Sequence, residues 1–143
     1  MSPARTGPPS LARSLAVAAL AALAAALTWA AWLGWESGYR TDPVTGAVSG
    51  PYSVGQVVGC GLTLAVVAVV AGRWSPPWFV APALTVAFTA AWTVDAVGKD
   101  DTGLFAVGAL LLLVGLGTAS ALVCTVAWLL GRRRRRPAAV PAG

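Results

Sequence analysis

The side chains that could do chemistry in this 143-residue chain are few. The sequence has five carboxylates and no histidine, so the commonest metal ligand and the usual general base are missing. Its two cysteines, Cys60 and Cys124, have no neighbouring Cys, His or Lys that would activate a thiol. No nucleophile lies beside a base, and no carboxylate spacing matches a metal-binding loop. We therefore expect no enzymatic activity, no cofactor and no metal site.

Five charged residues remain as candidates for a functional site, and they lie between long apolar stretches or at their ends. They are Glu36, Arg40, Asp42, Asp95 and Lys99. Asp95 ranks first among them, because an ionisable residue within an apolar stretch is a functional hypothesis by default. The alternative is an ordinary ion pair, since Lys99 lies four residues further along the same predicted helix.

A second charged group follows the last apolar stretch of the chain. It is a run of five arginines, Arg132, Arg133, Arg134, Arg135 and Arg136. Such a run beside a membrane attracts anionic lipid headgroups with up to about 1 kcal/mol per residue. We expect contact with anionic lipid and no binding of nucleic acid. Residues 132–143 are predicted to form a basic, disordered cytoplasmic tail.

The elements that must position these residues are membrane-spanning helices. The chain is 57% hydrophobic and 10% charged, whereas soluble domains carry about 25% charged residues. Crossing a bilayer as a helix takes roughly 20 apolar residues. Four stretches meet this requirement: 14–34, 54–72, 77–97 and 104–131. The sequence therefore predicts an all-α membrane protein with one four-helix domain over residues 1–131.

The charges are divided between the two sides of this four-span arrangement. One side carries only cations, which are Arg5, Arg13, Arg73 and the arginine run. The other side carries all five carboxylates, with Arg40 and Lys99 as its cations. The positive-inside rule then places both termini in the cytoplasm. Because the composition is rich in Ala, Val, Gly and Arg, we expect the cytoplasmic membrane of a bacterium.

The first stretch, 14–34, has an alternative interpretation as a cleaved signal sequence. Basic residues precede it and it is rich in alanine, as signal sequences are. Its apolar run is longer than the roughly 7–15 residues of a signal peptide core, and Trp29 and Trp32 crowd the expected cleavage site. We therefore favour a retained membrane span.

The longest polar segment, residues 35–52, joins the first two spans. Within it, residues 42–46 read Asp-Pro-Val-Thr-Gly, which suits a short hairpin connection. The flanks 38–41 and 47–50 can pair as an antiparallel ribbon. Ser53 and Gln56 have the spacing of a capping box at the start of the second span. We expect a β-hairpin-like loop on the exoplasmic side.

Hydroxyl groups form a stripe on the third span at Thr85, Thr89 and Thr93. One interpretation is a polar lining for a permeation path. The favoured interpretation is that each hydroxyl donates to the carbonyl four residues earlier, which satisfies a threonine within a membrane helix.

These observations favour a non-enzymatic membrane component or a subunit of a larger assembly. The expected partners are the lipid bilayer and either a second copy of the chain or another membrane protein. The alternative is a small transporter or channel that acts as an oligomer. The architecture resembles that of the small multidrug-resistance transporters, but those have a buried glutamate in the first span, where 14–34 has no carboxylate.

Overall fold

The computed structural model describes residues 10–35, 38, 40–50, 52–100 and 103–134. The elements follow in the order α1 (Leu11–Trp32), β1 (Arg40–Thr41), β2 (Val48–Ser49), α2 (Val54–Trp74), α3 (Pro77–Val97) and α4 (Phe105–Arg134). Each of the four helices is long and apolar enough to cross a membrane. The predicted four-helix architecture is therefore confirmed.

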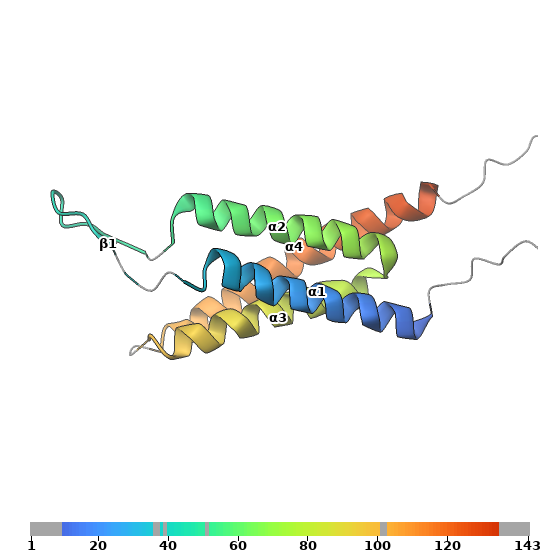
Figure 1. The fold of residues 1–143 in the computed structure, drawn as a ribbon, viewed down its shortest axis with the longest axis horizontal. Coiled ribbons are helices and arrows are strands. Elements are labelled where there is room, and N and C mark those ends of the chain that lie inside the picture. The colour runs from blue at the N-terminus through green and yellow to red at the C-terminus, as the bar shows by residue number, and fades with distance from the viewer. Residues whose placement is uncertain (1–9, 36–37, 39, 51, 101–102, 135–143) are drawn as a thin grey trace, which may run out of the picture.

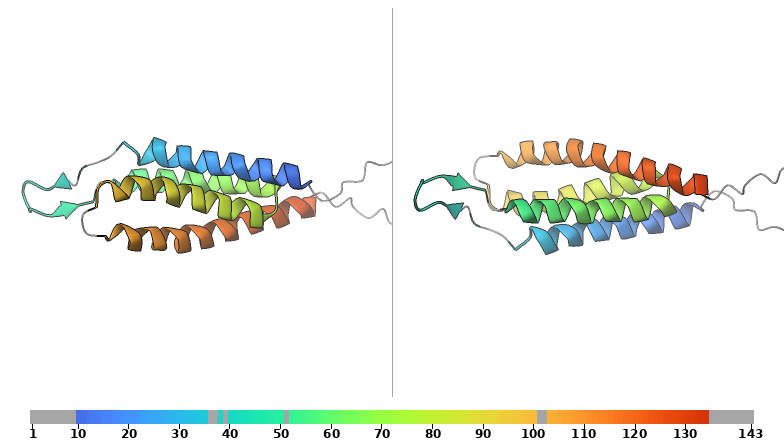
Figure 2. Two further views of the ribbon diagram at one scale, coloured as in Figure 1. Left: turned by 90° about the horizontal axis from the view of Figure 1, so that it is seen from below. Right: turned by 90° about the horizontal axis from the view of Figure 1, so that it is seen from above.

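The helices lie side by side and alternate in direction (Figures 1 and 2). α1 packs against α2 and α3, and α4 packs against the same two helices. α1 and α4 have no contact with each other in the part of the chain that the structure describes. The start of α1, the α2–α3 turn and the end of α4 lie at one end of the bundle. We call it the cationic end, because it carries Arg13, Arg73, Arg132 and Arg133; the opposite, acidic end carries Asp42, Asp95 and Asp100.

The helix boundaries differ from the predicted ones mainly at the cationic end. α1 begins at Leu11, where the Ser10 hydroxyl accepts a hydrogen bond from the Arg13 amide at 3.4 Å. α4 continues to Arg134 and so includes three residues that were predicted to belong to a disordered tail. Arginine is a good helix former, and cations are favoured in the last turn by the helix dipole. Residues 135–143 lie outside the described part of the chain.

Small side chains fill much of the bundle interior. Leu84 and Val80 of α3 are its largest fully buried residues, and Ala25 of α1 is also fully buried. Both cysteines are free and buried, and the Cys124 thiol donates to the Ala68 carbonyl oxygen at 3.5 Å, which joins α4 to α2. In the absence of a hydrophobic drive in lipid, such close approach of the backbones is what holds helices together.

The loop between α1 and α2 contains a short ribbon at the place where the sequence predicts one. β1 and β2 pair in antiparallel fashion, with Arg40 opposite Ser49 and Thr41 opposite Val48. Gly46 closes the turn at φ +67°, a left-handed conformation that suits glycine. The predicted capping box is present at the start of α2: the Gln56 side chain accepts from the Ser53 amide at 2.8 Å, and the Ser53 hydroxyl accepts from the Gln56 amide.

Candidate functional site

The predicted charged residues of the acidic end do not form a common cluster among the side chains that the structure describes. Asp95 and Lys99 do meet: the Lys99 ammonium nitrogen lies 2.7 Å from an Asp95 carboxylate oxygen. The Lys99 side chain is 42% exposed and that of Asp95 19% exposed, so this is an i,i+4 pair at the helix end. Only the backbone of Arg40 is described, and Glu36 lies outside the described residues. No group of three potential metal-ligating side chains occurs within the described part of the chain.

Asp42 has a structural role in the hairpin turn. Its carboxylate oxygen Oδ1 accepts hydrogen bonds from the amides of Val44 at 2.8 Å and Thr45 at 3.2 Å. These two backbone bonds, with Val44 contributing most, lower the pKa of the Asp42 carboxyl from its ordinary value. In the connection between α3 and α4, the Asp100 carboxylate accepts a hydrogen bond from the Phe105 amide and so caps the start of α4.

Two arginines at the cationic end of the bundle each contact a tryptophan ring. The guanidinium carbon of Arg132 lies 4.4 Å from the centre of the Trp128 ring, and Trp128 in turn meets Trp78 of α3 edge to face at 5.6 Å. On the other side of the bundle, the guanidinium carbon of Arg13 lies 5.3 Å from the Trp74 ring centre. Of the remaining predicted lipid-contact residues, Arg133 is exposed, the Arg134 side chain is not described, and Arg135 and Arg136 lie outside the described residues.

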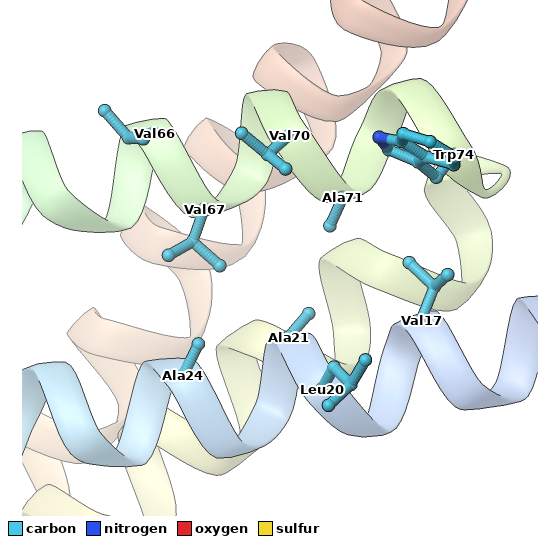
Figure 3. Close-up of a pocket in the computed structure, with 9 residues that line it drawn as sticks. All are labelled: Val17, Leu20, Ala21, Ala24, Val66, Val67, Val70, Ala71 and Trp74. Carbon is cyan, nitrogen blue, oxygen red and sulfur yellow. The ribbon is translucent and has the colours of Figure 1, made fainter.

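A groove between α1 and α2 was not predicted from the sequence (Figure 3). It has a volume of about 420 Å³ and is lined almost entirely by apolar atoms. Ala21 and Ala24 of α1 face Ala71 and Val67 of α2 across it, and Trp74 stands at its cationic end. Small side chains on facing positions leave the space unfilled. The signal in the sequence was the set of alanines in the first two spans near their cationic ends.

At the acidic end, by contrast, α1 and α2 are in close contact. The ring of Trp32 covers Gly59, where an added Cβ would lie 2.5 Å from a ring carbon. The Trp32 indole N–H donates to the Thr63 hydroxyl at 3.2 Å, and the Gln56 side-chain amide donates to the Trp32 carbonyl oxygen at 3.3 Å. Trp32 therefore packs between α1 and α2.

The threonine stripe of α3 behaves as expected at one position and differently at two. The Thr93 hydroxyl donates to the Thr89 carbonyl at 2.7 Å, four residues earlier. The hydroxyl oxygens of Thr85 and Thr89 are buried and have no hydrogen-bond partner. The prediction is thus wrong for these two residues. The Thr85 side chain lies beside Gly117 of α4, where its methyl is 3.6 Å from the position of an added Cβ.

Comparison with known proteins adds no relative. No family model matches the sequence, and no curated protein and no solved structure is significantly similar to it.

Proposed function

We propose that this protein is a non-enzymatic membrane component that acts as a subunit of a larger assembly, with α4 as its contact helix. The proposal goes beyond the multi-pass membrane protein that the four apolar helices support. Its partner is a second copy of the chain or another membrane protein. Anionic lipid headgroups surround the arginines that follow Trp128.

The observation that carries this proposal is the poor coverage of α4. Only 11% of its most apolar window is buried inside the bundle, against 28–33% for the other three helices. Leu111, Val114 and Leu122 are each more than 60% exposed. Ala121 and Thr125 are exposed on the same helix, and small residues let a neighbouring helix approach closely.

Photo-cross-linking in native membranes tests this role of α4. A photoreactive amino acid at Leu111 or at Leu122 is expected to cross-link to one and the same protein, identified by mass spectrometry. The matched control is Leu23 of α1, which is 57% exposed and is expected to cross-link to lipid. Cross-links to lipid alone at all three positions would contradict the proposal.

The proposed topology has both termini in the cytoplasm of a bacterium and the hairpin outside. Its support is the division of charge, since the cationic end gathers arginines and no carboxylate among the described residues. A cysteine introduced at Val44, which is 91% exposed, should react with a membrane-impermeant maleimide in intact cells. A cysteine at Gly143 should react only after lysis. The opposite pattern would reverse the topology.

The alternative function is transport of a small solute or ion by an oligomer. The observation that favours it is the pair of buried hydroxyls, Thr85 and Thr89, which have no hydrogen-bond partner and lie well inside α3. Asp95→Ala is then expected to abolish flux in proteoliposomes. If the unmodified protein transports none of a panel of ions and cationic solutes, this alternative is excluded.

A further inference from the structure

The groove between α1 and α2 has the size and lining of a binding site for an apolar chain. Its volume of about 420 Å³ falls within the roughly 300–1,000 Å³ of small-molecule sites. On α1 its lining runs from Val17 to Ala24, a length of about 10 Å at 1.5 Å per residue. Its walls offer almost no polar atom, so a polar occupant would lose its hydrogen bonds there.

The groove opens on the outer surface of the bundle, where lipid surrounds a membrane protein. Leu20, Val66 and Val70 line it and are each more than half exposed. An acyl chain is narrow enough to lie along the groove between the two helices, and such chains are already present in the surrounding bilayer.

A cation stands at the mouth of this groove. Arg13 lies over the ring of Trp74, which is itself part of the groove wall. A guanidinium carries five N–H donors in a fork that matches the oxygens of a phosphate. Arg13 has no ion-pair partner among the described residues, where the only ion pair is Asp95–Lys99 at the opposite end. The first turn of α1 has no acidic residue either, so its N-terminal amides also favour an anion.

We propose that the groove binds one acyl chain of an anionic phospholipid and that Arg13, held over Trp74, binds the phosphate of that lipid. The apolar chain and the phosphate then occupy features that are adjacent in the structure. This site is distinct from the arginine run at the end of α4, and it depends on neither α4 nor a protein partner. It can therefore fail while the proposed assembly role stands, and the reverse also holds.

Lipid binding to the purified full chain tests the site. Native mass spectrometry in detergent would count the molecules of phosphatidylglycerol or phosphatidylcholine retained by each chain. We expect one tightly held phosphatidylglycerol. Arg13→Gln should lower its affinity about tenfold, as for loss of a charge-assisted hydrogen bond, with little change for phosphatidylcholine. The matched control is Arg73→Gln at the same end of the bundle, because Arg73 is exposed, does not line the groove and lies beside Gly131 of α4; this variant should retain the lipid.

Filling the groove should have a different effect from removing the charge. Ala24→Phe places a ring in the groove and should weaken retention of both lipids, whereas Ala19→Phe, at an exposed position of α1 outside the groove, should not. Circular dichroism and gel filtration would verify the fold, and Ala24→Leu is the milder variant if Ala24→Phe does not fold.

Three results would overturn the proposal. One is equal retention of the two lipids by the unmodified protein, and another is equal loss in Arg13→Gln and Arg73→Gln. The third is a disulfide between two copies through Val70→Cys in native membranes, which would show that a second chain covers the groove.

Discussion

α1 and α2 form one helix pair with two different ends. At the acidic end, the Trp32 ring lies on Gly59 and its N–H bonds Thr63 of the facing helix. At the cationic end, alanines face each other across an apolar groove of about 420 Å³, and the tryptophan, Trp74, stands at the edge instead of filling the space.

The difference lies in how a large ring is matched to the opposite helix. At the acidic end a tryptophan faces a glycine, so the ring fits between the backbones and gains a hydrogen bond. At the cationic end Ala21 and Ala24 face Ala71 and Val67, and these smaller side chains leave the interval open. The contact of Trp32 with Gly59 fixes α1 against α2, and the groove at the cationic end leaves room for a molecule from the bilayer.

The largest effect is expected from breaking the contact at the acidic end. Gly59→Leu would force the Trp32 ring aside and remove its bond to Thr63. We expect the free energy of unfolding to fall by about 3 kcal/mol, the upper end for overpacking. SDS titration followed by circular dichroism measures it. Gly61→Leu is the control, because a Cβ there meets nothing within 4 Å; an equal loss in both variants would contradict the contact.

Replacing either of two neighbouring alanines on α1 by leucine should change the free energy of unfolding by different amounts. Ala25 is fully buried, so Ala25→Leu is expected to cost about 1–3 kcal/mol by overpacking. Ala24 lines the groove, so Ala24→Leu should change the free energy of unfolding by less than about 1 kcal/mol in lipid-free detergent. Thermal unfolding of both variants measures the difference. Equal destabilisation would mean that the groove is not open space.

A smaller effect is expected from the hydrogen bond that crosses between the helices. Thr63→Val removes the acceptor of the Trp32 N–H. Hydrogen bonds between membrane helices contribute about 0.6 kcal/mol on average and at most about 1.7 kcal/mol, and we expect a loss within that range. Thr118→Val is the control, since the exposed Thr118 hydroxyl bonds only its own helix, at the Val114 carbonyl. A double-mutant cycle with Trp32→Phe should show coupling; its absence would contradict the bond.

The parts of this structure that the sequence predicted are local along the chain. Span lengths follow from runs of apolar residues, and the Asp42 turn and the Ser53 capping box involve residues at most five positions apart. Asp95 and Lys99 were likewise expected to pair at one helical turn. In each case the backbone geometry of a single element brings the two groups together.

The contacts between helices could not be predicted in the same way. Trp32 and Thr63 are 31 residues apart, and their meeting depends on how α1 and α2 are rotated about their axes. These helices are apolar on all sides, so no hydrophobic face in the sequence fixes that rotation. The same reason explains Arg13 over Trp74, the groove beside it, and the unpartnered hydroxyls of Thr85 and Thr89.

The smallest effect, and one confined to the acidic end, is expected from pH. The pKa of the Asp42 carboxyl in the folded protein is lowered from its ordinary value because the carboxylate accepts from the Val44 and Thr45 amides. Stability from these bonds is therefore present above the ordinary pKa of an aspartate and is lost as the pH falls through the lowered pKa. In NMR spectra of the protein in micelles, the Val44 and Thr45 amide signals should shift together as the pH falls through this lowered pKa.

Two comparisons make this pH experiment specific to the turn. In Asp42→Asn the side-chain carbonyl can still accept both amides but does not titrate, so the shifts should disappear while the hairpin stays paired. The Trp32 indole signal at the same end of the bundle should not follow the transition, because its partner, the Thr63 hydroxyl, does not ionise. A shift of the indole signal with that of Val44 would mean that the hairpin unfolds together with the contact between α1 and α2. If the two signals change independently, the stabilising contact is confined to the membrane-spanning residues, where Trp32 covers Gly59.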